Sequence, residues 1–198
     1  MSSISQVKDS SRYEFENPVP NKYFLSPSAI PLKDGTSYYH SQGGLLNSYQ
    51  SAINKNISIG GGLELFSLFF SRSPSVYSNI KISDSASSRF HYGGGVFTGG
   101  ALGRGEFSSL LFAAPYAVMT FGDFDHNITF GGGAVFTNDS MDDHFWVFNI
   151  TAMDRMSQKV SVISNNFLGV LEKGFIEFFS IQGMRIMSKS VAIDIGLI

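Results

Sequence analysis

The stretch SVAIDIGLI, residues 190–198, alternates between apolar side chains and small or polar ones. In an extended chain, one face would carry Val191, Ile193, Ile195 and Leu197, and the other would carry Ala192, Asp194 and Gly196. The stretch VYSNIKIS from Val76 follows the same rule and separates its apolar residues from Tyr77, Asn79 and Lys81. A period of two with one continuous apolar face predicts a half-buried β-strand. In a soluble sheet that face meets a protein core, whereas in an outer-membrane barrel it meets lipid.

A weak internal repeat supports an all-β chain. NISIGGGLEL from Asn56, RFHYGGGVFT from Arg89 and NITFGGGAVF from Asn127 each place a glycine triplet after two apolar residues. The repeat falls on every second predicted strand, as in a meander. We expect the inward glycines to relieve crowding in a barrel, with Phe90, Tyr92 and Phe130 covering the bare backbone. A phosphate-binding loop would require a following helix, and the sequence predicts none.

Short strand-like runs separated by turn residues continue to the end of the chain. The predicted strands are 22–31, 36–52, 56–71, 75–84, 88–103, 107–121, 126–138, 143–155, 159–170, 175–187 and 190–198. We expect residues 1–21 to form a flexible polar lead-in and residues 22–198 to form a single barrel domain. The connections at both ends of the barrel are predicted to be short.

The composition narrows the class of protein. Charged residues make up 15% of the 198 residues, which is below the ~25% of soluble domains, and the formal charge of −2 gives no basic face for nucleic acid. No run approaches the ~18 apolar residues of a membrane helix. The chain has no cysteine and therefore no disulfide framework or thiolate metal site.

The predicted architecture is a closed, antiparallel, up-and-down transmembrane β-barrel of about ten to twelve strands. Bacterial outer-membrane barrels of one chain have an even number of strands, so we favour twelve. Either the stretch around residues 13–15 or part of 22–52 supplies another strand, or the chain stops one strand early; we favour a missing or displaced twelfth strand. The first residues show no secretory signal, and we expect that a signal was removed or lies outside this sequence.

From about Asn21 onward the sequence resembles a family of functionally uncharacterised outer-membrane β-barrel proteins of Bacteroidetes-type bacteria. The segments that carry the likeness are NKYFLSPSAIPLKDGTSYYHS from Asn21, NISIGGGLEL from Asn56 and GMRIMSKSVAIDIGLI from Gly183. The resemblance implies an exported barrel that begins with a signal and a small polar region and continues past the position of Ile198. It implies location in the bacterial outer membrane and brings no catalytic residues.

The polar faces of the predicted strands supply the candidate site residues. Those expected to face the lumen are Glu64, Lys81, His91, Glu177, Arg185 and Asp194. A two-residue turn at Ser188 and Lys189 would place Asp194 diagonal to Arg185 on the same face. We interpret this pair as a structural ion pair that stiffens the wall; a row of such charges that tunes ion selectivity is the alternative.

The sequence predicts no enzyme, cofactor or metal site. His40 and Ser41 suggest a hydrolase, but neighbouring strand residues point to opposite faces and cannot form a dyad. His91, His126 and His144 lack metal-ligand spacing, and the acidic turns at Asp123–Asp125 and Asp139–Asp143 are interpreted as solvated.

Three functional classes remain. The first is a structural envelope barrel with a filled polar lumen, and the second is a narrow channel for small solutes or ions. The third is a soluble barrel that binds an apolar ligand. For the first two the partner is outer-membrane lipid, no nucleic acid is expected, and the sequence does not fix the oligomeric state.

Overall fold

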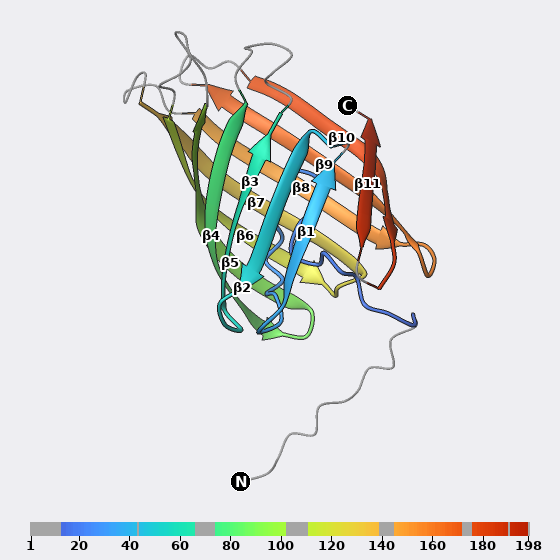
Figure 1. Cartoon of the computed structure of the whole chain (residues 1–198). Helices are drawn as coiled ribbons and strands as arrows, with labels where there is room; N and C mark the ends of the chain where they lie inside the picture. Colours follow the sequence, from blue (N-terminus) through green and yellow to red (C-terminus); the bar gives the residue numbers. More distant parts are fainter. Residues whose placement is uncertain are drawn as a thin grey trace.

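The computed structural model describes residues 13–42, 44–65, 74–101, 111–138, 145–171, 176–189 and 191–197. Within them eleven β-strands form a closed barrel (Figure 1). The strands are β1 (Ser37–Gln42), β2 (Leu46–Ala52), β3 (Ile57–Glu64), β4 (Ser75–Ser87), β5 (Phe90–Ala101), β6 (Leu111–Gly122), β7 (His126–Thr137), β8 (Phe145–Arg155), β9 (Val160–Leu171), β10 (Ile176–Met187) and β11 (Ala192–Leu197). The described residues contain no helix of the length and apolarity needed to cross a membrane.

The barrel is closed by a parallel pair of strands. Each strand from β1 to β11 is antiparallel to the next, and β11 then pairs with β1 in parallel. An odd number of alternating strands leaves the first and last running in the same direction, so this closure must be parallel. The prediction of a closed all-β barrel is confirmed. The preferred count of twelve and a wholly antiparallel sheet are wrong, because closure needs no further strand.

The predicted strand 36–52 is a hairpin. Its halves are β1 and β2, which pair from Ser37 opposite Ser51 to Gln42 opposite Leu46. The turn between them contains Gly44 at a φ of 74°, a conformation that glycine adopts without steric cost. The sequence pattern missed the turn because the residues on both sides of it favour strands.

The predicted strand 22–31 does not form. Residues 13–32, which we call the luminal segment, begin at the lower rim of the barrel and then run irregularly behind β1 and β2 (Figure 1). One isolated bridge, between Lys22 and Pro27, is its only β-pairing among the described residues. Tyr23, Ala29 and Ile30 have no exposed surface.

The luminal segment also corrects the predicted lead-in. Residues 1–12 lie outside the described residues, but Tyr13, Asn17 and Val19 are buried. The polar composition of this region had suggested a solvated tail. Many of its polar groups instead bond side chains that project inward from the barrel wall.

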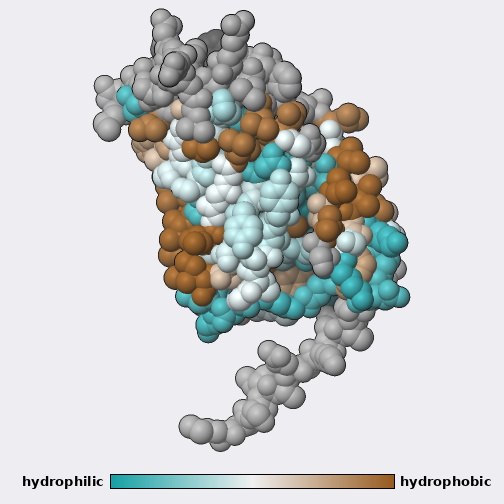
Figure 2. Space-filling model, viewed as in Figure 1, coloured by the Kyte–Doolittle hydropathy of each residue, from teal (hydrophilic) through white to brown (hydrophobic). Residues whose placement is uncertain are grey.

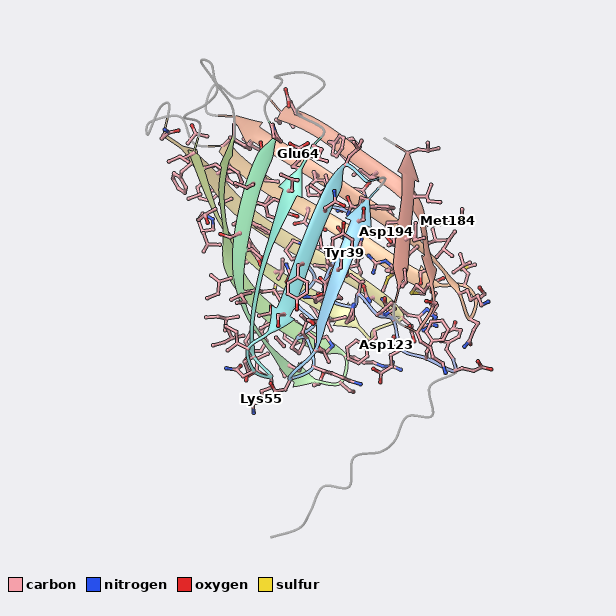
Figure 3. All side chains as sticks on the ribbon, viewed as in Figure 1. Tyr39, Lys55, Glu64, Asp123, Met184 and Asp194 are labelled. Atoms are coloured by element: carbon pink, nitrogen blue, oxygen red, sulfur yellow. The ribbon has the colours of Figure 1, made fainter. Side chains whose placement is uncertain are left out.

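The strands present apolar side chains outward and polar ones inward. Ile82, Ile193 and Phe178 are 60%, 53% and 70% exposed, whereas Thr129 and Thr151 are fully buried. Figure 3 shows the same division, with Met184 projecting from the outer side and Asp194 lying inside the outline of the barrel. The predicted facing of the alternating segments is therefore confirmed.

Figure 2 shows apolar surface on both flanks of the barrel and a more polar strip between them. The strip covers β1 and β2, where Tyr39, Ser41 and Asn47 face outward. The Tyr39 and Ser41 hydroxyls donate to the Asn47 side-chain oxygen at 2.6 and 2.8 Å. Asn47 in turn donates to the Gly44 carbonyl, so these outward polar groups satisfy one another.

The two ends of the barrel differ. The connections at one end are confined to residues 53–56, 88–89, 123–125, 156–159 and 188–191. At the other end the strands are joined by residues 43–45, 65–74, 102–110, 138–144 and 172–175. The prediction of short connections is confirmed for the first end; at the second end, residues 66–73, 102–110, 139–144 and 172–175 lie outside the described residues.

Candidate functional site

Three cations of the barrel wall hold the backbone of the luminal segment. Arg185 donates to the carbonyls of Val19 and Lys22 at 2.6 and 2.9 Å. Lys81 donates to the carbonyls of Ser28 and Ile30, both at 3.0 Å. Buried carbonyls without a partner would be costly, and these bonds replace the ladder that a strand would have provided.

Arg155 holds the first part of the segment. Its guanidinium donates to the Phe15 carbonyl at 3.0 Å and to the Asp125 carboxylate at 2.8 Å. The same group lies 4.0 Å from the centre of the Tyr13 ring. Tyr13 returns a hydrogen bond to the Arg155 carbonyl. The segment is therefore fixed where it enters the barrel.

Neutral side chains complete the attachment. The Asn165 side-chain oxygen accepts from the amides of Leu25 and Ser26, and the Thr120 hydroxyl accepts from the amide of Ala29 at 2.8 Å. The Tyr23 hydroxyl donates to Asn127 at 2.6 Å. These bonds hold the segment at several points along its length, which favours one fixed arrangement over a loosely held tail.

A buried charge cluster lies where β10, β11 and β1 meet. Arg185 binds both carboxylate oxygens of Asp194, at 2.8 and 2.9 Å, and His40 contacts Asp194 at 2.8 Å. Lys22 approaches from the luminal segment and donates to the Ser48 hydroxyl at 3.2 Å. Burial lowers the pKa of Lys22 to about 8, although Asp194 acts in the opposite direction. The cluster therefore links the barrel wall to the luminal segment.

The structure brings four of the six predicted lumen residues inside the barrel. Lys81, His91, Arg185 and Asp194 are buried, and the first and third of these touch the luminal segment directly. His91 instead bonds Ser85 on the adjacent strand at 2.7 Å.

The other two predicted lumen residues lie near the end of the barrel that has the longer connections. Glu64 is half-buried at the last position of β3, and Glu177 is exposed near the start of β10. Alternation predicted that both positions face inward. Glu64 lines a cavity together with Phe24 and Leu25 of the luminal segment, whereas Glu177 is exposed.

Sequence reasoning missed Arg155, Lys22 and Asn165. Arg155 was detectable, because alternation along FWVFNITAMDR places it on the same face as Asn149 and Thr151. Asn165 follows the same logic on β9. Lys22 was hidden by the assumption that its surroundings form a strand.

His40 and Ser41 point to opposite sides, as predicted: His40 is buried against Asp194, and Ser41 bonds Asn47 on the outer surface. Ser48 lies across from His40 on β2, so acid, base and hydroxyl occur side by side. The second ring nitrogen of His40 has no hydrogen-bond partner within the described part of the chain, so it does not activate Ser48. The arrangement is that of a structural cluster.

The acidic turn at Asp123 and Asp125 is occupied by its own neighbours. The Asp123 carboxylate accepts from the amides of Asp125 and His126, and Asp125 pairs with Arg155. Residues 139–143 and His144 lie outside the described residues. Among those described, no group of three His, Cys, Asp or Glu could hold a metal ion.

The glycine triplets make room for inward aromatic rings. A Cβ on Gly62 would lie 2.5 Å from the Tyr77 ring, and one on Gly95 would lie 2.9 Å from the Tyr116 ring. Phe97 stacks on Tyr116 with ring centres 5.1 Å apart. At these two positions the rings come from inward-facing residues, whereas a Cβ on Gly132 would lie 3.1 Å from the outward Phe148 ring. Tyr92 and Phe130, two of the three rings predicted to cover the bare backbone, line an outer hollow with Gly93 and the triplet at 131–133.

Comparison of the chain with known protein families, with curated proteins and with solved structures finds no match to any of the three. The resemblance carried by the segments from Asn21, Asn56 and Gly183 therefore stays a prediction. Functional conclusions depend on the geometry alone.

Proposed function

We propose that this chain is a bacterial outer-membrane β-barrel whose own residues 13–32 close its lumen, so that it serves a structural role in the envelope and forms no open pore. The observation that carries the proposal is the inversion of an ordinary protein interior. Large apolar side chains such as Ile82 and Phe178 face outward, whereas Arg155, Lys81 and Arg185 are buried inside. A soluble barrel would expose that apolar surface to water at considerable cost, whereas hydrocarbon solvates it.

The contents of the lumen favour a closed barrel over a channel. An open ion pathway needs water along its length, yet the centre of this barrel is occupied by Tyr23, Ala29 and Ile30, which have no exposed surface. The Ala29 amide bonds Thr120, and the Ile30 carbonyl bonds Lys81. The Tyr23 hydroxyl bonds Asn127 of the wall. Removing the segment from its place would break all of these bonds at once.

The outward direction of the apolar side chains also argues against a soluble barrel that binds an apolar ligand. Such a barrel needs an apolar interior, but inward positions at mid-height are Thr120, Thr129, Thr151 and Asn165. The side chains of these residues form hydrogen bonds with one another and with the luminal segment. The Thr120 and Thr129 hydroxyls, for example, lie 2.7 Å apart.

Two measurements test the proposal. The full chain, extracted in detergent and reconstituted in phospholipid vesicles, should migrate differently on a denaturing gel before and after boiling, because a folded membrane barrel resists the detergent. It should not conduct ions in planar bilayers. A chain that is monomeric and soluble in buffer without detergent would overturn the membrane assignment, and a steady unitary conductance would favour the channel.

A further inference from the structure

The β-ladder that closes the barrel, between β1 and β11, is short. The two strands pair at only two positions, Ser41 with Ile193 and Gln42 with Asp194. After Gln42 the chain turns away into β2, whereas β11 continues to Leu197 with β10 as its partner. Residues 195–197 therefore lack a β-ladder on their β1 side within the described structure. Figure 1 shows β11 extending past the end of β1.

A cavity of about 570 Å³, which we call the chamber, lies at the seam between β1 and β11. Its apolar lining consists of Phe24, Leu25, Leu45, Leu46, Phe179 and Ile181. The lumen beside it carries many buried hydroxyl, amide and charged groups, such as Thr129, Asn165 and Arg185, together with small buried apolar clusters. The size of the chamber falls in the range of small-molecule sites, about 300–1,000 Å³.

Leu25 is the most informative residue of the chamber. Its neighbours Phe24 and Ser26 are 3% and 2% exposed, yet Leu25 is 41% exposed although it lies within the barrel. Phe24 is fixed because its ring lies against Gly183 and Gly196, where a Cβ would come within 2.8 and 3.1 Å of it. The luminal segment is therefore firmly seated here and still presents a partly uncovered apolar side chain, which lines both this chamber and a neighbouring cavity that Phe97, Tyr116 and Phe167 also line.

The chamber is continuous with the outer apolar surface. Its lining includes Ile195, whose side chain is 55% exposed on the outer side of β11, beside Ile193 and Leu197. In a membrane, the surface that surrounds this opening contacts lipid chains. The polar lining groups include Glu64 and Asp194, and Asp194 is already neutralised by Arg185. This lining provides no cation for an anionic head group.

We propose that the chamber binds one acyl chain of a membrane phospholipid, which enters sideways through the β1–β11 seam while its head group remains outside. This inference rests on the proposed function, because the hydrocarbon must reach the seam. The apolar lining excludes water, and the exposed Leu25 side chain gains the contact that the protein itself does not give it.

The test uses quenching of tryptophan fluorescence by vesicles of phosphatidylcholine brominated on its acyl chains. The chain has a single tryptophan, Trp146, which is 48% exposed on the outer surface. Quenching of Trp146 reports contact with lipid and tests the proposed function by itself. For the inference, Leu25→Trp is placed in a Trp146→Phe background. A Tyr38→Trp variant in the same background is the control, because Tyr38 is buried in the lumen outside the chamber.

We expect Trp at position 25 to be quenched nearly as strongly as Trp146, and Trp at position 38 several-fold less. If Trp146 is quenched while positions 25 and 38 are equally protected, the inference is wrong and the proposed function stands. If Trp146 is not quenched, the proposed function fails as well. Quenching at position 25 by a brominated free fatty acid alone, and not by the phospholipid, would overturn the choice of ligand.

The route is tested by a charge at the mouth of the chamber. Ile195→Asp in the Leu25→Trp, Trp146→Phe background should reduce quenching several-fold, because a hydrocarbon chain that enters beside the carboxylate would remove its hydrating water. Ile193→Asp is the matched control, since Ile193 lies on the same outer face with nearly equal exposure, 53% against 55%, and does not line the chamber. Equal quenching in the two variants would overturn entry through the seam.

Discussion

Arg185 on β10 and Asp194 on β11 are directly opposed, and the guanidinium binds both carboxylate oxygens while also donating to the carbonyls of Val19 and Lys22. The sequence had suggested a diagonal pair across a two-residue turn. The actual turn spans residues 188–191 and pairs Met187 with Ala192, which moves Asp194 into register with Arg185. This alignment lets one side chain serve two purposes: it closes an ion pair in the wall and holds the luminal segment.

Replacement of Arg185 by leucine should therefore be severe. Asp194 would stay buried with His40 as its remaining partner, and two carbonyls of the segment would lose their donor. Breaking a buried pair in this way costs about 3–5 kcal/mol. The measurement is the free energy of unfolding in urea, in vesicles. The double variant Arg185→Leu with Asp194→Leu should recover part of the loss, because no unpaired charge remains.

The control for that variant is Lys33→Leu. Lys33 pairs with Glu16, but both side chains are more than half exposed, at 61% and 57%. An exposed pair contributes about 1 kcal/mol or less. Equal losses for Arg185→Leu and Lys33→Leu would contradict the role given to Arg185.

Lys81→Met should loosen the luminal segment without unfolding the barrel. The variant removes the donor shared by the Ser28 and Ile30 carbonyls, at an expected cost of about 1–3 kcal/mol. Hydrogen exchange at the Ala29 amide, which bonds Thr120, should become faster, while amides in β8 and β9 keep their rates. Lys55→Met, at an exposed turn, should change neither. Uniformly faster exchange would show that Lys81 supports the whole barrel instead.

Sequence patterns were sufficient to predict the strands of the barrel wall but not the path of the segment inside it. Alternation along β4 and β11 fixed which side chains face outward, because a period of two has only two phases. It could not reveal that residues 22–31 pass through the middle of the barrel, since that path depends on hydrogen-bonding partners such as Arg185 and Asn165, which lie far away in the chain. Alternation also continues through the bend at Gly44, so the hairpin was read as one strand.

The predicted strand total had been eleven, which equals the observed number, but for the wrong reason. One strand too many at 22–31 offset one too few at 36–52. Of the site, Lys81, His91, Arg185 and Asp194 were found from facing alone. The His40 contact with Asp194 could not be predicted, because it requires the parallel closure of β1 on β11, and a parity rule for bacterial barrels argued against that closure.

The glycine triplets provide a test of crowding inside the barrel. Gly62→Ala would bring a methyl group within 2.4 Å of the Asn47 carbonyl and 2.5 Å of the Tyr77 ring, whereas the nearest atom to a methyl group on Gly61 would be 3.1 Å away. We expect Gly62→Ala to lower the free energy of unfolding by about 1–3 kcal/mol, as overpacking does, and Gly61→Ala to cost distinctly less. If the two variants lower the free energy of unfolding in urea by similar amounts, the glycines are needed for the backbone conformation and not to make room for the aromatic rings.

The membrane assignment can be tested with two isoleucines of nearly equal exposure. Ile193 lies on the outer face of β11 and Ile53 lies in the turn after β2, at 53% and 55% exposed. In water the two would respond alike to arginine. In a bilayer, Ile193→Arg should cost up to about 2–4 kcal/mol, whereas Ile53→Arg, at the end of the barrel, should cost about 0–1 kcal/mol. The free energies of unfolding in phospholipid vesicles decide between these cases, and equal small costs would mean that hydrocarbon does not surround the strands.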